Sequence, residues 1–206
     1  MAVGTAATVK ALTMDQVRDT RTQVILGNTY HLMMRPGGDL VEKMGGLHKF
    51  GGWHGPILTD SGGFQVMSLS NLVKMKEEGV EFTSHIDGGI KHFLRPEDSV
   101  HIQHQLDSNI TMVLDECLHL PTTRDRAEKN VAMVTRWAKR SKDAFIDRPG
   151  YGIFGIVQGA NYKDLREKSA KQLTEIGFDG YAVGGLAVCE PQEVMFDMIA
   201  HTTPFL

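Results

Sequence analysis

The chain has 206 residues, of which 41% are hydrophobic and 23% are charged, and its formal net charge is -3. This composition is typical of a globular protein, and a chain of this length buries roughly 70% of its unfolded surface in one core. We exclude a membrane span, a signal peptide and a disulfide framework. No apolar run nears the ~20 residues of a membrane helix, the N-terminus is neither basic nor strongly apolar, and the only cysteines are Cys117 and Cys189. We expect one domain, residues 1–206, in a reducing cytoplasm.

Short apolar runs that each end in polar residues or glycine predict the strands of a buried sheet. They are residues 24–26, 57–59, 110–114, 153–157 and 181–183, and a strand fragment is expected within residues 3–12. Helices are predicted at about 15–20, 36–46, 96–106, 122–145 and 161–176, and a last helix begins near Pro191. The longest helix is expected to begin with a capping box of Thr122 and Asp125, and the next to stop at Gly177.

Residues 80–94 have a different pattern. Val80, Phe82 and Ser84 alternate with polar residues, and Asp87-Gly88-Gly89 precedes a second short apolar stretch. This arrangement predicts a β-hairpin, which we interpret as an insertion between the helices and strands of the main domain.

The alternation of apolar strands with helices indicates an α/β protein whose parallel sheet is covered by helices. A doubly wound sheet and a TIM barrel both fit this pattern, and both place active sites at the C-terminal ends of the strands. The chain contains no GxxxxGK[ST] motif, so the versions of these folds that bind a nucleotide through such a phosphate-binding loop lose support.

Residues that come directly after the predicted strands are expected to converge at one edge of the sheet. They are Asn28, Asp60, Gln65, Asp115, Gln158 and the backbone N–H groups near Gly184 and Gly185. Asp60 alone indicates ordinary turn chemistry, since Asp before Ser-Gly-Gly commonly caps the turn or helix after it. Together, carboxylates, amides and open backbone suit a planar heterocycle such as guanine. A carboxylate accepts from its ring N–H and amino groups, and an N–H donor satisfies its carbonyl oxygen.

Five ordered motifs carry a resemblance to a known family. They are Gly27-Asn28-Thr29-Tyr30-His31-Leu32, Leu58-Thr59-Asp60-Ser61-Gly62-Gly63-Phe64-Gln65, Asp115-Glu116-Cys117, Gly155-Ile156-Val157-Gln158-Gly159 and Gly180-Tyr181-Ala182-Val183-Gly184-Gly185-Leu186-Ala187. The chain resembles the bacterial tRNA-guanine transglycosylases, also called queuine tRNA-ribosyltransferases, over nearly its whole length. The resemblance implies a TIM-barrel pentosyltransferase of queuosine biosynthesis. Such an enzyme exchanges guanine at the tRNA wobble position for the 7-deazaguanine prequeuosine base.

The resemblance also implies roles for single residues. Asp60 matches the family's catalytic proton acceptor, Asp115 and Gln158 match its base-reading side chains, and Gly185 matches its backbone donor. Phe64 occupies the stacking position, and Leu186 and Glu190 fall where the family contacts and tunes the aminomethyl end of the base. Ser61, Gly62 and Gly63 complete the expected base-binding set, which Asn28, Gln65, Cys117 and Glu190 are expected to support. The triplet that begins at Asp115 resembles enzymes that take the prequeuosine base rather than queuine.

Some family features have no counterpart in this sequence. We expect an incomplete barrel of about six strands with a hairpin insertion, without the last two strands, the nucleophilic aspartate that attacks the ribose, or the zinc-binding Cys/His segment. The resemblance implies zinc and a homodimer for the full-length family, and no cofactor or metal in this chain. We therefore expect that this chain alone catalyses no exchange. Cys117 and Cys189 are expected to be small buried residues, although Cys189 replaces a glycine that is usual in the family loop.

Two other functions stay open, a non-catalytic nucleobase-binding or interaction module and an unrelated TIM-barrel lyase. The lyase would need a strand-end lysine or a phosphate-binding loop, and neither is evident. His101 and His104 are interpreted as part of a solvated helix face rather than as metal ligands. The basic residues Arg136, Lys139, Arg140 and Lys142 are interpreted as a solvated outer face, with contact to tRNA phosphates as the alternative.

Overall fold

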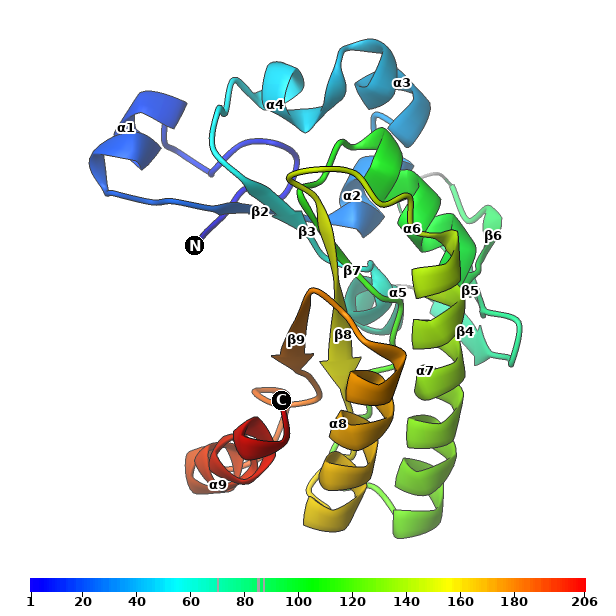
Figure 1. Cartoon of the computed structure of the whole chain (residues 1–206). Helices are drawn as coiled ribbons and strands as arrows, with labels where there is room; N and C mark the ends of the chain where they lie inside the picture. The colour runs from blue at the N-terminus through cyan, green and yellow to red at the C-terminus, as the bar shows by residue number, and fades with distance from the viewer. Residues whose placement is uncertain (70, 85, 87) are drawn as a thin grey trace.

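A six-stranded parallel sheet forms the centre of the protein in the computed structural model, which describes residues 1–69, 71–84, 86 and 88–206 (Figure 1). Its strand order is β1-β2-β3-β7-β8-β9, and each strand runs parallel to its neighbours. The strands are β1 (Ala2–Val3), β2 (Ile25–Gly27), β3 (Ile57–Thr59), β7 (Ile110–Met112), β8 (Gly152–Val157) and β9 (Gly180–Val183). The predicted α/β class and the predicted parallel strands are therefore confirmed.

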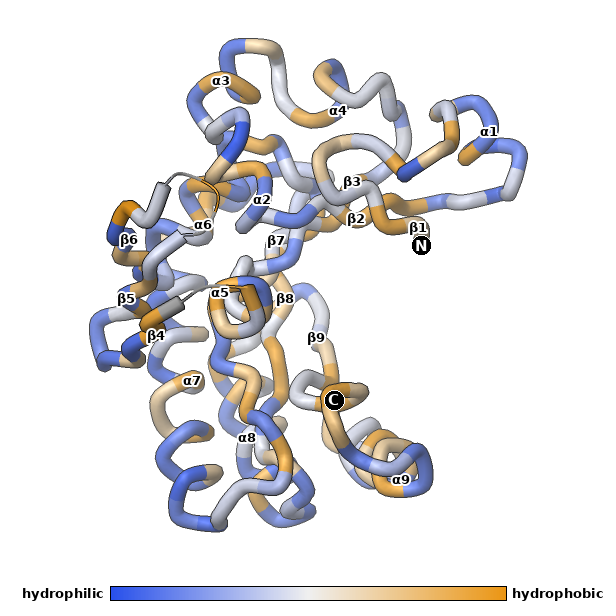
Figure 2. Tube along the Cα trace, turned by 180° about the vertical axis from the view of Figure 1, so that it is seen from behind, coloured by the Kyte–Doolittle hydropathy of each residue, from blue (hydrophilic) through white to orange (hydrophobic). Residues whose placement is uncertain are grey.

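The outer strands β1 and β9 each pair on one side only in the part of the chain that the structure describes. The sheet is consequently open, and closure into a barrel is not observed. Figure 2 shows apolar segments along the central strands, whereas α7 (Arg124–Ala144) and α8 (Lys163–Ile176) carry many hydrophilic residues. Within the described ranges, no helix is both long and apolar enough to cross a membrane.

Helices connect the strands and cover the sheet. Besides α7 and α8 they are α1 (Met14–Asp19), α2 (Thr29–Met34), α3 (Gly38–Lys43), α4 (Gly46–Gly51), α5 (Gly63–Leu69), α6 (Pro96–Gln105), α9 (Gln192–Thr202) and the 3-10 turn η1 (Thr203–Phe205). The helix predicted at 36–46 is confirmed as the shorter α3, which ends before Gly45, whose left-handed φ of 89° favours glycine. The helix α4 that follows was not predicted. The helix α2 was not predicted.

The longest helix, α7, buries the predicted apolar face of Ala127, Val131, Val134 and Ala138. Its start differs from the prediction. Thr123, one residue later than expected, is the N-cap and accepts a hydrogen bond from the Arg126 amide at 3.3 Å. The helix α8 ends as predicted at Gly177, whose φ of 76° favours glycine.

The basic side of α7 is exposed at Arg136 and Lys139, as predicted, and its arginines also have ion-pair partners within the chain. Arg136 holds both carboxylate oxygens of Glu77 at 2.6 and 2.7 Å, and Arg140 holds Glu97 at 2.7 and 2.8 Å. Trp137, buried between them, donates to the main-chain oxygen of Glu77 at 2.7 Å. Arg136, Trp137 and Arg140 fasten α7 to the turn after β4 (Asn71–Met75). Each of the two arginines also has a carboxylate as its partner.

The predicted hairpin is part of a three-stranded antiparallel sheet of β4, β5 (Val80–Thr83) and β6 (Lys91–Leu94). The pairing of Val80 with Leu94 confirms the hairpin, whereas β4 was not predicted because lysines interrupt its apolar residues. Asp87 of the expected turn lies outside the described residues. The buried face of this sheet packs on Val66 of α5 and Trp137 of α7, which holds the insertion beside the main sheet.

A buried amide fixes α6 to the strands that carry the site. The Gln103 side chain accepts from the Thr59 hydroxyl at 3.0 Å and from the Met112 amide at 2.8 Å, and it donates to the Met112 oxygen at 2.9 Å. These bonds join α6 to the C-terminal ends of β3 and β7. Because a buried amide is costly to leave unpaired, this arrangement favours one register of the two strands.

Candidate active site

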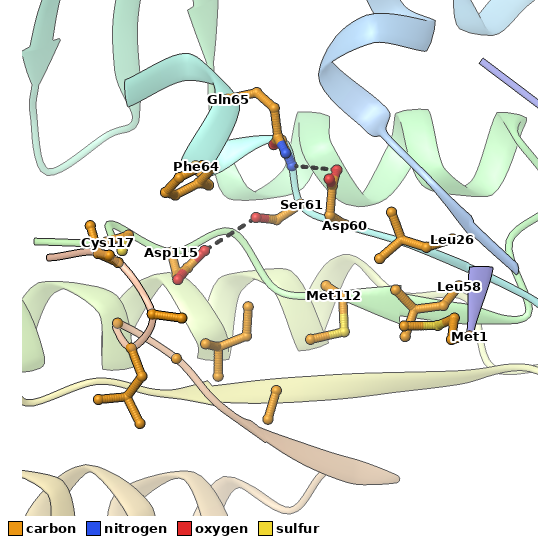
Figure 3. Close-up of a pocket in the computed structure, with 18 residues that line it drawn as sticks. Met1, Leu26, Leu58, Asp60, Ser61, Phe64, Gln65, Met112, Asp115 and Cys117 are labelled. Carbon is orange, nitrogen blue, oxygen red and sulfur yellow. Dashed lines mark hydrogen bonds between the residues drawn. The ribbon is translucent and has the colours of Figure 1, made fainter. Parts of the chain in front are cut away.

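A pocket of about 450 Å³ opens where the parallel strands end (Figure 3). Its floor is apolar and its polar groups come from the loops after β3, β7 and β9. The floor consists of Leu26, Leu58, Met112, Ile156 and Ala182, and the remaining wall includes Asp60, Ser61, Gly62, Phe64, Gln65, Asp115, Cys117, Gly184, Gly185 and Leu186. Ligand pockets commonly combine an apolar lining with a few placed polar groups.

Asp60 lies directly after β3, and its carboxylate is held from several sides. One oxygen accepts from the amides of Thr29 at 2.9 Å and Gly62 at 3.2 Å, and the other accepts from the Asn28 amide group. Burial raises the pKa of Asp60 above its ordinary value, although these hydrogen bonds oppose the rise. Asn28 does not line the pocket, so its contribution to the site is to orient Asp60.

Asp115 lies after β7 and faces the same pocket. One carboxylate oxygen accepts from the Ser61 hydroxyl at 3.2 Å and the other from the Gln158 amide group at 2.7 Å. Burial raises the pKa of Asp115 to about 6, and the charge of Asp60 adds to the rise. Asp115 is thus an oriented acceptor whose remaining lone pairs can meet two donors of a ligand.

Gln158 and the glycines after β9 fit closely against each other. A Cβ on Gly185 would lie 2.5 Å from Oε1 of Gln158, and Gly185 has a φ of 63°, so a side chain is excluded on both counts. The Gly184 amide donates to the Val157 oxygen at 2.9 Å. The amides of Gly185 and Leu186, by contrast, have no acceptor within the described part of the chain. Both of these residues line the pocket.

The first turn of α5 closes another side of the pocket. Phe64 is exposed and offers a ring face, and the Gln65 side chain buries an Oε1 that has no hydrogen-bond partner among the described residues. Gly63 does not line the pocket but packs against it, because a Cβ there would lie 2.5 Å from the Asp115 main-chain oxygen. Its amide donates to the Ser61 hydroxyl at 3.3 Å. The turn is therefore positioned by its contact with Asp115.

The loop after β9 is held by its own carboxylate. Glu190 accepts from the amides of Val188 at 3.1 Å and Cys189 at 3.2 Å, and also from that of Ala187. Burial opposes the ionisation of Glu190, but the main-chain bonds outweigh it and hold its pKa below the ordinary value. Glu190 does not line the pocket, so it acts on the site through the shape of the loop.

The two cysteines differ. Cys117 lines the pocket and is buried as predicted, and burial raises the pKa of its thiol to about 11. Cys189 is exposed, so the prediction that it is buried is wrong. It lies in the loop between β9 and α9. Cys117 therefore stays protonated at neutral pH and is not an activated nucleophile.

Glu116 is a buried carboxylate to which the sequence pattern assigns no role. It is paired with Arg126 and accepts from the side-chain amide of Asn130 at 2.9 Å. Both partners lie on the first turns of α7, four residues apart. The group thereby fastens the start of α7 directly behind Asp115. The sequence signal for this group is an acidic residue after a strand, followed by two polar residues at the start of the next helix.

We expect Arg126→Met to lower the free energy of unfolding by about 3 kcal/mol, because it leaves the buried Glu116 carboxylate without its cation. Chemical denaturation at pH 7 measures this change. The matched control is Lys129→Met, whose pair with Asp125 is exposed and should contribute less than about 1 kcal/mol. Equal losses in the two variants would contradict a structural role for the buried pair.

No three His, Cys, Asp or Glu side chains gather into a metal site in the ranges that the structure describes. On α6, His101 is exposed and His104 is partly buried, in line with the solvated helix face that we expected.

Comparison with known proteins identifies relatives of the chain. The profile of the family described as queuine tRNA-ribosyltransferase matches residues 1–206. The queuine tRNA-ribosyltransferases of Granulibacter bethesdensis, Brucella suis and Rickettsia canadensis are 59%, 57% and 54% identical to the chain over all 206 of its residues. The chain spans about half the length of these curated relatives, from 54% to 57%. Because the family profile matches the whole of the chain, the chain belongs to the queuine tRNA-ribosyltransferase family.

Proposed function

We propose that the pocket binds guanine and the 7-deazaguanine prequeuosine base, and that the chain supplies the base-reading part of an enzyme that exchanges them at the wobble position of tRNA. The observation that carries this proposal is the oriented Asp115 carboxylate in the same pocket as the unused amides of Gly185 and Leu186. We further propose that the open parallel sheet is part of a TIM-type barrel. The names of the relatives support tRNA as the partner.

The chemistry of guanine matches this arrangement group by group. The ring N–H and the amino group would donate to Asp115, and the carbonyl oxygen would accept from the amides of Gly185 and Leu186. Adenine lacks that carbonyl oxygen and that ring N–H, so it would leave the pocket's buried polar groups unpaired at roughly 1 to 3 kcal/mol each. The exposed ring of Phe64 would stack on the base.

Asp60 is proposed as the proton acceptor of the exchange. Its raised pKa and its three hydrogen-bond donors suit a carboxylate that takes up a proton and keeps its orientation. The proton would be the one released when the ring nitrogen of the incoming base forms its bond to the ribose. The Gln65 amide oxygen, buried without a partner among the described residues, can accept a further donor of the base.

Exchange of labelled guanine into tRNA tests this function. We expect incorporation when the chain is mixed with the segment of the Granulibacter relative that it does not cover. If the chain binds guanine but the mixture incorporates no label, the chain is a nucleobase-binding module without catalysis. A matched mixture that carries Asp60→Asn should lose incorporation while the chain still binds guanine.

Guanine affinity should depend on pH through Asp115. Only the ionised carboxylate accepts from both guanine donors, and its pKa is raised to about 6, so affinity should be constant above that pH. Below it, affinity should fall about tenfold per pH unit. Calorimetric titrations from pH 4.5 to 8 measure this, and the Asp115→Asn variant should lose the dependence. A flat profile in the unmodified chain would contradict the role of an ionised Asp115.

A further inference from the structure

Arg166 on α8 is a fully buried arginine beside the pocket. Its guanidinium donates to three main-chain oxygens, those of Ala160 at 2.7 Å, Gly184 at 3.1 Å and Gly185 at 3.5 Å. The first of these lies after β8, two residues beyond Gln158, and the other two lie after β9. Arg166 therefore joins the two loops that carry a base-reading side chain and the free amides.

Arg166 has no carboxylate partner within 4 Å in the described part of the chain. Burying a charge without an ion pair is costly, and this burial lowers the pKa of Arg166 to about 10. The side chain remains charged at neutral pH all the same. The charge of Glu190 opposes this fall in the pKa, and the three main-chain oxygens that Arg166 bonds also offset the cost of burying it.

The direction of the Gly184 and Gly185 carbonyls indicates what Arg166 does at the site. In a planar trans peptide the N–H points opposite to the preceding C=O. Because the oxygens of Gly184 and Gly185 point to Arg166, the N–H groups of Gly185 and Leu186 point the other way. Both residues line the pocket, and neither amide has an acceptor among the described residues. The left-handed φ of Gly185 brings successive peptides into the curved form that can bind an anion or oxygen.

We propose that Arg166 is a positioning residue that turns the amides of Gly185 and Leu186 toward the base and strengthens them as donors to its carbonyl oxygen. This inference rests on the proposed guanine binding. The positive guanidinium polarises both peptides through their oxygens, and hydrogen bonds in such a chain reinforce one another. The donor pair is thereby oriented before the base arrives, which reduces the reorganisation that binding would otherwise require.

Two bases separate this role from simple bracing of the loops. Guanine has the carbonyl oxygen, whereas 2-aminopurine keeps the amino group but lacks both that oxygen and the ring N–H, and only the oxygen would contact the two amides. We expect Arg166→Met to weaken guanine binding about tenfold to a hundredfold and to change 2-aminopurine binding less than about twofold. Arg166→Lys, which retains the charge but has no planar fork, should fall between. Calorimetry measures guanine binding, and fluorescence measures 2-aminopurine binding.

The matched control is Arg136→Met, which removes an arginine that braces α7 away from the pocket and should leave both affinities unchanged. Equal weakening of both bases by Arg166→Met, or no weakening of either, would overturn the proposal. If Arg166→Met does not fold, the lysine variant decides by the same ratio. Failure of the unmodified chain to bind guanine would instead contradict the proposed function itself.

Discussion

Asp115→Asn should weaken guanine binding by about a hundredfold or more. The change replaces a charged acceptor by an amide, which presents donors to the donors of guanine. Two charge-assisted hydrogen bonds are lost, each with a net contribution of roughly 1.5 to 3 kcal/mol, and about 2.7 kcal/mol corresponds to a hundredfold change. Calorimetric titration measures it. Asp143→Asn is the matched control, because Asp143 is an exposed partner of Lys139.

The same substitution should have the opposite effect on stability. Because the pKa of Asp115 is raised in the folded protein, its protonated form favours folding, and that stability is lost as the pH rises from about 4 through about 6. At pH 7 the ionised Asp115 therefore destabilises the fold, and Asp115→Asn should be more stable. Below pH 4 the difference should vanish. A variant that lost both affinity and stability at pH 7 would contradict a binding role that is separate from folding.

Gly63→Ala should affect both the fold and the site. The new Cβ would lie 2.5 Å from the Asp115 main-chain oxygen, and neither α5 nor the end of β7 can move without disturbing the pocket. We expect a loss of about 2 kcal/mol in the free energy of unfolding and about tenfold weaker guanine binding. Denaturation and calorimetry on the same sample measure the two effects.

Gly4→Ala provides the control for this substitution. Its Cβ would meet its nearest neighbours at 3.6 Å, which is ordinary contact, so stability should change by less than about 0.5 kcal/mol. If Gly63→Ala behaves like Gly4→Ala, the close packing of α5 on Asp115 does not position the site.

The pocket could be predicted from the sequence because it depends on parallel strands. Asp60, Asp115 and Gln158 each come after an apolar run, and parallel strands bring such residues to one edge whatever the details of the helices. The structure places all three at that edge, together with Gly185. Periodicity likewise located α7 and α8, whose apolar faces are long and regular.

The features that escaped prediction depend on contacts between distant residues. Gln103, Glu116 and Arg166 are polar residues whose partners lie on other elements, and a linear pattern does not distinguish them from exposed polar residues. Thr29 and Tyr30 at the start of the short helix α2 are buried by contacts with other elements, which the spacing of apolar residues along the sequence does not reveal. The capping-box spacing of Thr122 and Asp125 favours Thr122 as the N-cap, but a second threonine follows it, and only the backbone selects between the two.

Calorimetric titration of the folded chain with guanine, the prequeuosine base and adenine is the decisive measurement for the base-reading role. We predict that guanine and the prequeuosine base bind and that adenine does not bind at the same concentrations. Equal binding of adenine, or no binding of guanine by a chain shown to be folded, would contradict the claim that these strand ends form a guanine-reading site.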